Sequence, residues 1–450
     1  MVILGLGSNL GDRLANLRKA LEHIKKIPQT IVQQISPIYI SDALVPENAP
    51  TTWDIPYLNL AIRCDTQLTS YEFLKHTKEI EIAVGRTPEK NWGPRIVDID
   101  LLAWDDLIQY DEKLHIPHEY LHERPFALWP LADIAPQWRY PLPGSLQGKT
   151  AAELATQWGS RFTGSAPLHT KQIQQRIDAP QLVGILNITP DSFSDGGQFM
   201  EPAAAIQHAR ELVNAGAEII DIGAESTGPK AQPLNPTEEW QRLEPVLIAL
   251  LQDIQQMPIP PKISVDTRHA DVAKKALLLN VAWINDVSGL VDPVMRELMA
   301  NNTNDIVLMH NLGVPVSSGR CLPYSQEPSS TIYSWGEKQL NELEKMGISA
   351  SRIIFDVGIG YGLIPEHSLA LLKQIETFHQ LKTRLLIGHS RKSFLQQFTS
   401  LLPAERDIET VTLSLYLANK NVNYLRVHNI EAHARAFKVM GALGHANEFA

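Results

Sequence analysis

The stretch LVGILNI, from Leu182 to Ile188, is the first of eight short apolar runs in the second part of the chain. Each run has the length of a buried strand, and stretches with helical periodicity, such as 203–215 and 271–280, lie between them. The later runs are EIIDIGAE, KISVDT, WINDVSG, DIVLMH, IIFDVGIG, RLLIGHS and YLRVHN. Eight strand-then-helix units predict a (β/α)8 TIM barrel. The alternative, a doubly wound open sheet, rarely contains eight strands with this regularity.

The eight runs share a second feature, because each is apolar where it begins and polar where it ends. In a barrel the carboxyl ends of the strands converge on one rim, where active sites are built. A single polar strand end also fits ordinary solvent exposure, but the whole set predicts one shared site. The residues at these ends are Asn187, Glu225, Asp266, Asn285, Asp286, His310, Asp356, Ser390, Arg426 and His428.

The segments after the strands indicate what this rim binds. NITPDSFSDGG (187–197) and ESTGPKAQPLNP (225–236) are rich in Gly, Pro and hydroxyl residues, which is typical of mobile lids and also of ordinary surface loops. GHSRKSFL places Arg391 and Lys392 at a strand-to-helix junction, and RVHN puts Arg426 and His428 on one strand face. These side chains predict a pocket for an anion or an electron-rich ring.

The first ~160 residues show a mixed α and β pattern without a regular repeat. Within them, the stretch VDIDLL (97–102) places Asp98 and Asp100 on one face of an expected strand. Two such carboxylates repel each other unless a cation lies between them, so they predict a Mg²⁺ site, with a solvated strand edge as the alternative. Cations and aromatic residues of this region suit a nucleotide and a flat heterocycle, although Trp92 and Phe126 also fit a hydrophobic core.

Composition narrows the class of protein. The formal net charge of -10 argues against general affinity for nucleic acids or anionic membranes, and no apolar run reaches membrane-spanning length. Two cysteines fit a reducing compartment, and no leader pattern precedes the first strand, so we expect a cytoplasmic protein. The polar segment 159–180 is the expected linker between a domain at 1–158 and a barrel at 181–450.

Several motifs closely resemble those of two known enzyme families. GLGSNLGDRLANL, YLNLAI, GRTPEKNWGPRIVDIDLL and PHEYLHERPFALWPLADIAP resemble 6-hydroxymethyl-7,8-dihydropterin pyrophosphokinase. ILNITPDSFSDGG, DIGAEST, SVDT, INDVSG, LMH, GHSRKSF and RVHN resemble dihydropteroate synthase. Their order in one chain resembles the bifunctional folate-biosynthesis enzymes, whose two activities are consecutive. The resemblance implies a ferredoxin-like α+β first domain, a TIM-barrel second domain, and ATP, hydroxymethyldihydropterin and p-aminobenzoate as substrates.

For the first domain the resemblance also implies the roles of individual residues. Asp98 and Asp100 would hold two Mg²⁺ ions against ATP, and Tyr57, Asn59 and Phe126 would bind the pterin. The residues implied to hold the nucleotide are Arg86, Trp92, Arg95, His118 and Arg124, with Arg86 and Arg95 acting in catalysis.

For the barrel the resemblance implies that Asp266 and Lys392 act in catalysis and that one Mg²⁺ binds with pyrophosphate at Asn187. The residues implied to bind the pterin, p-aminobenzoate or pyrophosphate are Asn187, Thr227, Asp266, Asn285, Asp356, Lys392, Arg426 and His428. Asp266 would stabilise the cationic pterin methylene that is left when pyrophosphate departs. The family also implies a possible homodimer formed through the barrel domain.

Three positions depart from the synthase pattern. Gly228 stands where the family usually has Arg, Val357 replaces the usual Pro of strand six, and Leu363 replaces the Lys that usually follows the Gly-aromatic-Gly run after it. Lys230 could supply the missing cation, or it could be a solvated loop residue. The departures leave open a barrel that binds pterin but only supports the kinase as a scaffold. A pterin-binding methyltransferase is a third alternative, against which the TPDSFSDGG loop and SRKS stand.

Overall fold

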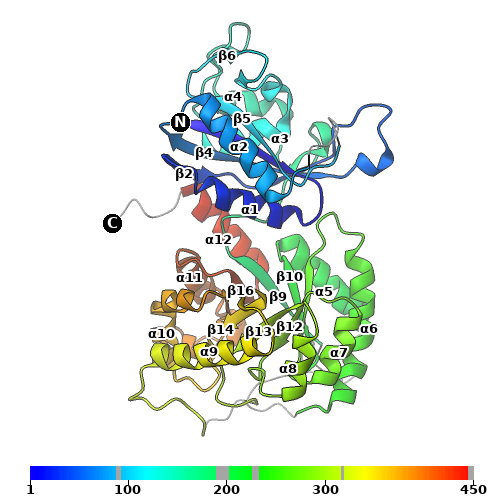
Figure 1. The fold of residues 1–450 in the computed structure, drawn as a ribbon, viewed down its shortest axis with the longest axis vertical. Coiled ribbons are helices and arrows are strands. Elements are labelled where there is room, and N and C mark those ends of the chain that lie inside the picture. The colour runs from blue at the N-terminus through cyan, green and yellow to red at the C-terminus, as the bar shows by residue number, and fades with distance from the viewer. Residues whose placement is uncertain (88–92, 189–201, 226–232, 316–318, 444–450) are drawn as a thin grey trace. The chain divides into compact units, whose positions relative to one another are not determined.

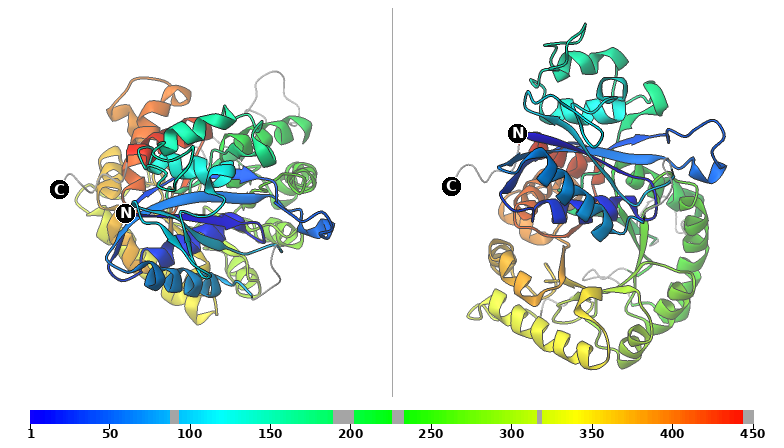
Figure 2. Two further views of the ribbon diagram at one scale, coloured as in Figure 1. Left: turned by 90° about the horizontal axis from the view of Figure 1, so that it is seen from above. Right: turned by 45° about the horizontal axis from the view of Figure 1, so that its top comes forward.

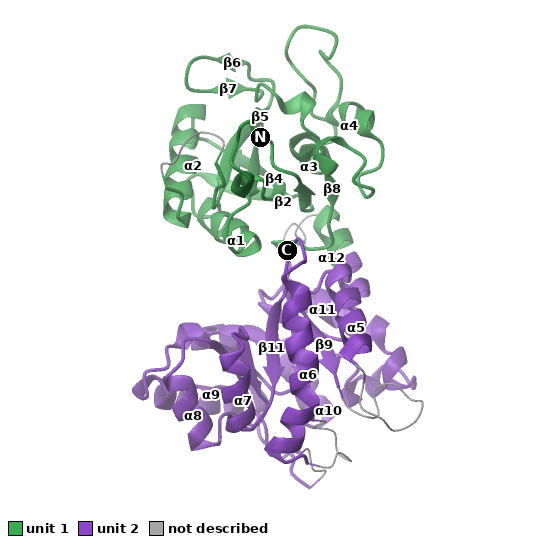
Figure 3. Ribbon diagram, turned by 90° about the vertical axis from the view of Figure 1, so that its right-hand side faces the viewer, with its two compact units in different colours: residues 1–178, 437–450 green, residues 179–436 purple. Residues whose placement is uncertain are grey.

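The computed structural model describes residues 1–87, 93–188, 202–225, 233–315 and 319–443. They divide into two compact units, Met1–Asp178 together with Phe437–Ala450, and Ala179–Ala436 (Figure 3). The segment predicted as a linker, up to Asp178, is grouped with the first unit. No described helix is long and apolar enough to cross a membrane.

The first unit is an antiparallel sheet covered by helices on both faces (Figure 3). The strand order is β5-β1-β4-β3-β8, and β2 also pairs with β4. Helices α1 and α2 cover one face, and α3 covers the other, with α4 packed against α3. The α+β fold predicted for this domain is confirmed. The elements are β1 Val2–Ser8, α1 Arg13–Ile24, β2 Thr30–Ile35, β3 Tyr39–Ser41, β4 Tyr57–Thr66, α2 Ser70–Val84, β5 Asp98–Trp104, β6 Gln109–Tyr110, β7 His115–Ile116, α3 Pro125–Ile134, α4 Ala151–Ala155 and β8 Lys171–Gln172.

Local sequence explains where the helices of this unit begin. The side chain of Asp12 accepts a hydrogen bond from the backbone N–H of Ala15, as expected for the N-cap of α1. Helix α2 is capped by Thr69, the residue before its first helical residue, Ser70. Thr69 and Glu72 form a capping box, in which each side chain accepts a hydrogen bond from the backbone N–H of the other residue.

The second unit is the predicted barrel: eight parallel strands closed in the order β10 to β16 and back to β9 (Figures 1 and 2). The strands are β9 Gln181–Asn187, β10 Ile219–Gly223, β11 Lys262–Asp266, β12 Trp283–Asp286, β13 Asp305–Met309, β14 Ile353–Asp356, β15 Arg384–Ile387 and β16 Tyr424–Val427. The helices are α5 Pro202–Ala215, α6 Pro236–Ile254, α7 Ala270–Leu278, α8 Pro293–Ala300, α9 Pro328–Lys345, α10 Pro365–Lys373, α11 Asp407–Ala418 and α12 Ile430–Leu443, of which the part from Phe437 on is grouped with the first unit.

The barrel interior is packed at the start of the strands and open at their ends. One apolar cluster takes a side chain from each of seven strands: Val183, Ile219, Trp283, Val307, Ile354, Leu386 and Tyr424. Trp283 and Tyr424 belong to strands far apart around the barrel, and their rings meet at 4.8 Å. Because alternate residues of a strand face the same side, the residues two and four positions later also point inward. Those positions carry the polar side chains of the site.

Candidate active sites

The cavity of the first unit lies at the ends of β1, β4 and β5 and has a volume of about 470 Å³. Strand β5 presents Asp98 and Asp100 to this cavity. Ile99, which lies between them, and Leu101, which follows Asp100, are buried on the other face. The prediction that the two carboxylates share a face is thus confirmed. On β1, Gly7 pairs with Asp98 and leaves the cavity open, since a β-carbon there would lie 3.4 Å from the Tyr57 ring.

Asp98 is held by two guanidinium groups. An amino nitrogen of Arg86 lies 2.7 Å from one carboxylate oxygen of Asp98, and Arg95 binds the other at 2.5 Å. Burial disfavours the charged form, but Arg95 and Arg86 outweigh it and keep the pKa of Asp98 below its ordinary value. Burial, followed by repulsion from Asp98, raises the pKa of Asp100 to about 7. This side of the cavity is therefore suited to polyphosphate and to a divalent cation.

The donor set fits Mg²⁺ only in part. The two carboxylates of β5 are oxygen ligands of the kind that Mg²⁺ prefers. Among the described residues, however, there is no cluster of three or more His, Cys, Asp or Glu side chains that could hold a metal ion alone. A cation at Asp98 and Asp100 would need further oxygen ligands, which water and the phosphates of a nucleotide could supply.

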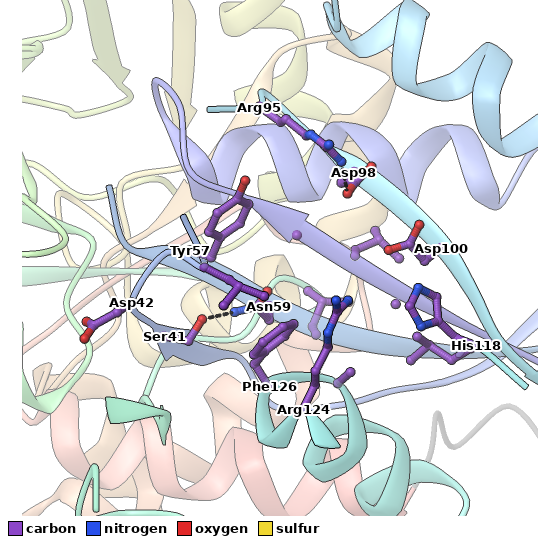
Figure 4. A pocket seen from close by; sticks show the side chains of 17 residues that line it. Ser41, Asp42, Tyr57, Asn59, Arg95, Asp98, Asp100, His118, Arg124 and Phe126 are labelled. Carbon is purple, nitrogen blue, oxygen red and sulfur yellow. Dashed lines mark hydrogen bonds and ion pairs between the residues drawn. The ribbon is translucent and has the colours of Figure 1, made fainter. Parts of the chain in front are cut away.

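The opposite side of the cavity can hold a flat ring. Figure 4 shows Tyr57 and Phe126 on either side of Asn59, with Arg124 beside Phe126. Asn59 is buried and its amide nitrogen donates to the Ser41 hydroxyl at 3.0 Å. Burial and the charge of Arg124 lower the pKa of His118 to about 4, so His118 faces the cavity as a neutral donor.

Most of the residues predicted for this site meet at one cavity. Tyr57, Asn59, Arg95, Asp98, Asp100, His118, Arg124 and Phe126 line it, and Arg86 reaches it through Asp98. Trp92 lies outside the described residues. Sequence reasoning missed Ser41 and the buried Glu81, which pairs with Arg86 and accepts the backbone N–H of Ile99.

The barrel cavity has a volume of about 790 Å³ and opens at the carboxyl ends of the strands. It takes the predicted side chains from the described part of the barrel: Asn187, Asp266, Asn285, Asp356, Lys392, Arg426 and His428. Glu225 and Ser390 also line it. Thr227, Gly228 and Lys230, and positions 189–197 of the first loop, lie outside the described residues.

Two strand-end residues do not belong to this cavity, so that part of the prediction is wrong. His310 packs edge-on against Trp335, with ring centroids 5.0 Å apart, and Asp286 accepts backbone N–H groups from Ser288 and Leu290. The reason is strand alternation, since Asn285 and Met309 take the inward positions next to them.

A buried carboxylate that sequence reasoning missed organises the barrel site. Asp221 on β10 is 1% exposed and accepts from the Ser264 hydroxyl at 2.5 Å and the Asn285 amide at 3.0 Å. It also binds Nε of Arg426 at 2.6 Å, while a terminal nitrogen of the same guanidinium binds Asp266 at 2.9 Å. Burial and then the charge of Asp221 raise the pKa of Asp266 to about 8, despite the attraction of Arg426.

Asp356, at the end of β14, and Lys392, in the segment that follows β15, both face the cavity. Burial raises the pKa of Asp356 to about 6, and its carboxylate accepts the backbone N–H of Gly358 at 2.8 Å. The ammonium group of Lys392 lies 4.4 Å from the centre of the Tyr361 ring, a cation–π contact that steers it over the cavity. Val357 is fully buried, so its replacement of the family Pro leaves the lining of the cavity unchanged.

The anion side of the cavity combines His428, Ser390 and Arg391. The Ser390 hydroxyl lies 2.9 Å from Nδ1 of His428. Burial and nearby cations, Arg391 first, lower the pKa of His428 to about 4. The guanidinium of Arg391 is paired with Asp407 at 2.8 Å, just as that of Arg426 is paired with Asp221 and Asp266, whereas the ammonium group of Lys392 contacts the Tyr361 ring.

Comparisons with known proteins identify the family to which each unit belongs. Residues 183–428 match the family described as pterin binding enzyme, and residues 3–136 match the 7,8-dihydro-6-hydroxymethylpterin-pyrophosphokinase family. The chain thus combines two kinds of pterin enzyme. The folate synthesis bifunctional protein of Chlamydia muridarum is 38% identical over 443 residues, which cover 96% of each chain. This chain belongs to the family of bifunctional folate synthesis proteins, which are transferases.

Solved structures support the assignment of the barrel. The dihydropteroate synthase of Anaplasma phagocytophilum with bound 6-hydroxymethylpterin-monophosphate is 36% identical, with a TM-score of 0.53, over 59% of this chain and 99% of that one. The enzyme of Xanthomonas albilineans with 4-aminobenzoic acid is 31% identical, with a TM-score of 0.54, over 59% and 93%. These relatives support the two-enzyme interpretation and favour neither the scaffold nor the methyltransferase alternative.

Proposed function

We propose that this chain catalyses two consecutive steps of folate synthesis. The first unit transfers pyrophosphate from ATP to 6-hydroxymethyl-7,8-dihydropterin and releases AMP. The barrel then condenses the pterin pyrophosphate with p-aminobenzoate to 7,8-dihydropteroate and releases pyrophosphate. The observation that carries this proposal is that each of the two family domains gathers, at one cavity, the charged and stacking groups that its reaction needs.

In the kinase site, Asp98 and Asp100 would hold two Mg²⁺ ions with ATP. Bound Mg²⁺ neutralises the charge that develops on the transferring group. Arg86 and Arg95, which bind Asp98 in the protein alone, would turn to the phosphates as the nucleotide arrives. Trp92, His118 and Arg124 would complete the nucleotide site, with His118 donating a hydrogen bond in its neutral form.

The pterin would lie between Tyr57 and Phe126, where aromatic faces stack on its ring (Figure 4). Asn59 would read its edge, because an amide offers both a donor and an acceptor. The hydroxyl of the pterin would then face the phosphates beside Asp98, so the two substrates meet with little remaining freedom.

In the synthase site, Asn285 and Asp356 would bind the amino-pyrimidine edge of the pterin. A carboxylate accepts two parallel N–H groups, and Asp356 is buried in a position to do so. Lys392 would contact the pterin carbonyl and line the p-aminobenzoate site. Asp266 would stabilise the cationic methylene left by departing pyrophosphate, which requires its ionised form.

The leaving pyrophosphate would be bound by Asn187, Thr227, Arg426 and His428. Asn187 would also hold one Mg²⁺, which supplies positive charge to the leaving group. Arg426 can serve because its guanidinium reaches the cavity while two carboxylates fix its direction. These two ion pairs would hold the guanidinium of Arg426 in place beside the cavity before the substrate binds.

Three further properties belong to the proposal. The catalytic units would correspond to 1–158 and 181–450, and the enzyme would work in the cytoplasm, where Cys64 and Cys321 can stay reduced, as both are free thiols in the structure. The barrel would form a homodimer, which is supported by apolar side chains that α11 and the segment before it expose, namely Phe398, Leu402 and Ile408.

One assay tests the two activities. The full-length protein is given hydroxymethyldihydropterin, ATP, Mg²⁺ and p-aminobenzoate, and AMP and dihydropteroate are both measured. We expect both products, loss of both when Mg²⁺ is chelated, and dihydropteroate without AMP when pterin pyrophosphate replaces the first substrates. AMP formation in the complete assay, with no dihydropteroate there or from supplied pterin pyrophosphate, would favour the scaffold interpretation of the barrel.

A further inference from the structure

The segment that follows the kinase fold adds a strand beside its pterin cavity. Strand β8 pairs with β3 at Tyr39 with Gln172 and at Ile40 with Lys171, while β4 pairs with the other side of β3. Without β8, the three residues of β3 would form the edge of the sheet. A short edge strand opens easily because its outer backbone groups have only water as a partner.

Backbone hydrogen bonds continue this contact beyond the paired residues. The N–H of Ile173 donates to the carbonyl of Ile38 at 2.9 Å, and the N–H of Asp42 donates to the carbonyl of Leu168 at 2.8 Å. Leu168 and His169 both have positive φ angles, 56° and 44°. Such conformations cost about 1 kcal/mol or more each for residues other than glycine, so the contacts with β3 must offset this cost.

A side-chain contact joins the same segment to α3. The guanidinium of Arg161 pairs with the carboxylate of Asp133, which also accepts the hydroxyl of Tyr39 at 2.7 Å. The side chain of Asp133 is only 14% exposed, so this ion pair is poorly screened by solvent. By contrast, His169 and Asp42 form an exposed pair that contributes little. Arg161 therefore links β3 and α3 through one carboxylate.

These two elements carry the walls of the pterin cavity. Strand β3 ends at Ser41, whose hydroxyl accepts the amide N–H of Asn59, and α3 begins beside Phe126 (Figure 4). Ser41 is 3% exposed and Asn59 is 6% exposed. With one N–H committed to Ser41, the Asn59 amide has a fixed orientation and keeps its oxygen and second N–H for a ligand.

We propose that the segment Gly159–Ile173 is a positioning element of the pyrophosphokinase site. By holding β3 and α3 together, it fixes the Ser41–Asn59 pair and Phe126 before the pterin binds. Arg161 is its main side-chain anchor and is a positioning residue, since it does not line the cavity. The inference rests on the proposed kinase function of the first unit and adds a role for the segment that leads toward the barrel.

The test replaces Arg161 by Met in the full-length protein, which removes the charge and keeps much of the side-chain length. We expect the KM for hydroxymethyldihydropterin to rise about 10-fold, which corresponds to ~1.4 kcal/mol. The kcat, the KM for ATP, and dihydropteroate formation from supplied pterin pyrophosphate should stay within about twofold. Arg139→Met is the matched control, because Arg139 is exposed and its guanidinium donates to a backbone carbonyl, that of Gly148.

A double-mutant cycle separates positioning from general loosening. Ser41→Ala should raise the same KM, and adding Arg161→Met should raise it by less than the product of the two single effects, because both act through Asn59. The proposal would be overturned if the effects of the two substitutions on the pterin KM simply multiply, or if Arg161→Met leaves the pterin KM unchanged. A rise in the KM for ATP equal to the rise in the KM for the pterin would overturn it too. If the unaltered protein forms no AMP, the kinase assignment itself has failed, which is a different result.

Discussion

Replacing Asp221 by Asn should shift the pH dependence of dihydropteroate synthesis to lower pH. Asp221 and Asp266 bind two nitrogens of the Arg426 guanidinium, at 2.6 and 2.9 Å. Burial raises the pKa of Asp266 to about 8, and the charge of Asp221 is the next cause. Glu239 and Asp286 also repel Asp266, so Arg426 is the only attraction among these neighbouring groups.

The direction of the shift follows from the form of Asp266 that the reaction needs. A carboxylate stabilises a cation, so kcat/KM should rise with pH as Asp266 loses its proton, with the midpoint of this limb near its pKa of about 8. In the Asp221→Asn variant, the repulsion between residue 221 and the Asp266 carboxylate disappears, and Asp266 is the one charged partner left to Arg426 of the two. Two like charges ~4–5 Å apart repel by ~3–4 kcal/mol at an effective dielectric constant of ~20. Because Arg426 already offsets part of this repulsion, we expect the midpoint of the rise in kcat/KM to move to lower pH by about 1–2 units.

The assay measures kcat/KM for pterin pyrophosphate at saturating p-aminobenzoate across neutral and alkaline pH. Ionisation of the substrates affects both enzymes equally, so the difference between the two profiles reports on the protein. Ser264→Ala is the control, since it removes a neutral partner of Asp221 without changing the charge. A folded Asp221→Asn enzyme whose activity drops by one factor at every pH, or whose limb moves upward, would refute the reasoning.

Three other predictions concern single side chains. Asp98→Ala should lower AMP formation by at least about 10³-fold, or ~4 kcal/mol, while synthase activity on supplied pterin pyrophosphate survives; loss of both activities in a folded variant would contradict independent sites. Lys392→Ala should raise the KM for pterin pyrophosphate and p-aminobenzoate by about 10-fold, because the cation over Tyr361 is lost, and values within twofold would remove it from the site. Lys230→Ala should lower synthase kcat/KM by roughly 10- to 100-fold, and adding Gly228→Arg should restore part of this loss. If the Lys230→Ala variant turns over normally at low substrate concentration, Lys230 has no role, and Arg426 must bind the departing pyrophosphate.

The sequence predicts the barrel well because each of its strands carries its own signal. An apolar run followed by a polar residue identifies every strand from β9 to β16 without knowledge of its partners. Strands β3 and β8 have three and two residues and no periodicity. They exist because they pair with each other across more than a hundred residues of sequence, and β8 lies in a polar segment that local pattern assigns to a linker.

The residues of the two sites could likewise be predicted from the sequence to different extents. Asp98 and Asp100 were predictable, because two charges on one face of an apolar strand need a partner. The same signal was present at Asp221, an acid in the middle of EIIDIGAE, and strand alternation would have placed it in the barrel interior beside Asn285. Its bonds to Arg426 could not be predicted, since they depend on closure of the barrel between β9 and β16.

In both sites, a carboxylate that we propose to act in the reaction contacts arginines that we propose to bind its phosphate groups. Asp98 is bound by Arg86 and Arg95, and Asp266 shares Arg426 with Asp221. In the protein alone these contacts neutralise charges that would otherwise be buried without partners. A polyphosphate would compete for the guanidinium groups because it offers more negative charge and can accept two parallel N–H bonds from one guanidinium. Its arrival would free Asp98 for a cation and would add a phosphate partner to Arg426, whose direction Asp221 and Asp266 already fix. The substrate itself would thus convert the resting ion pairs into the working arrangement.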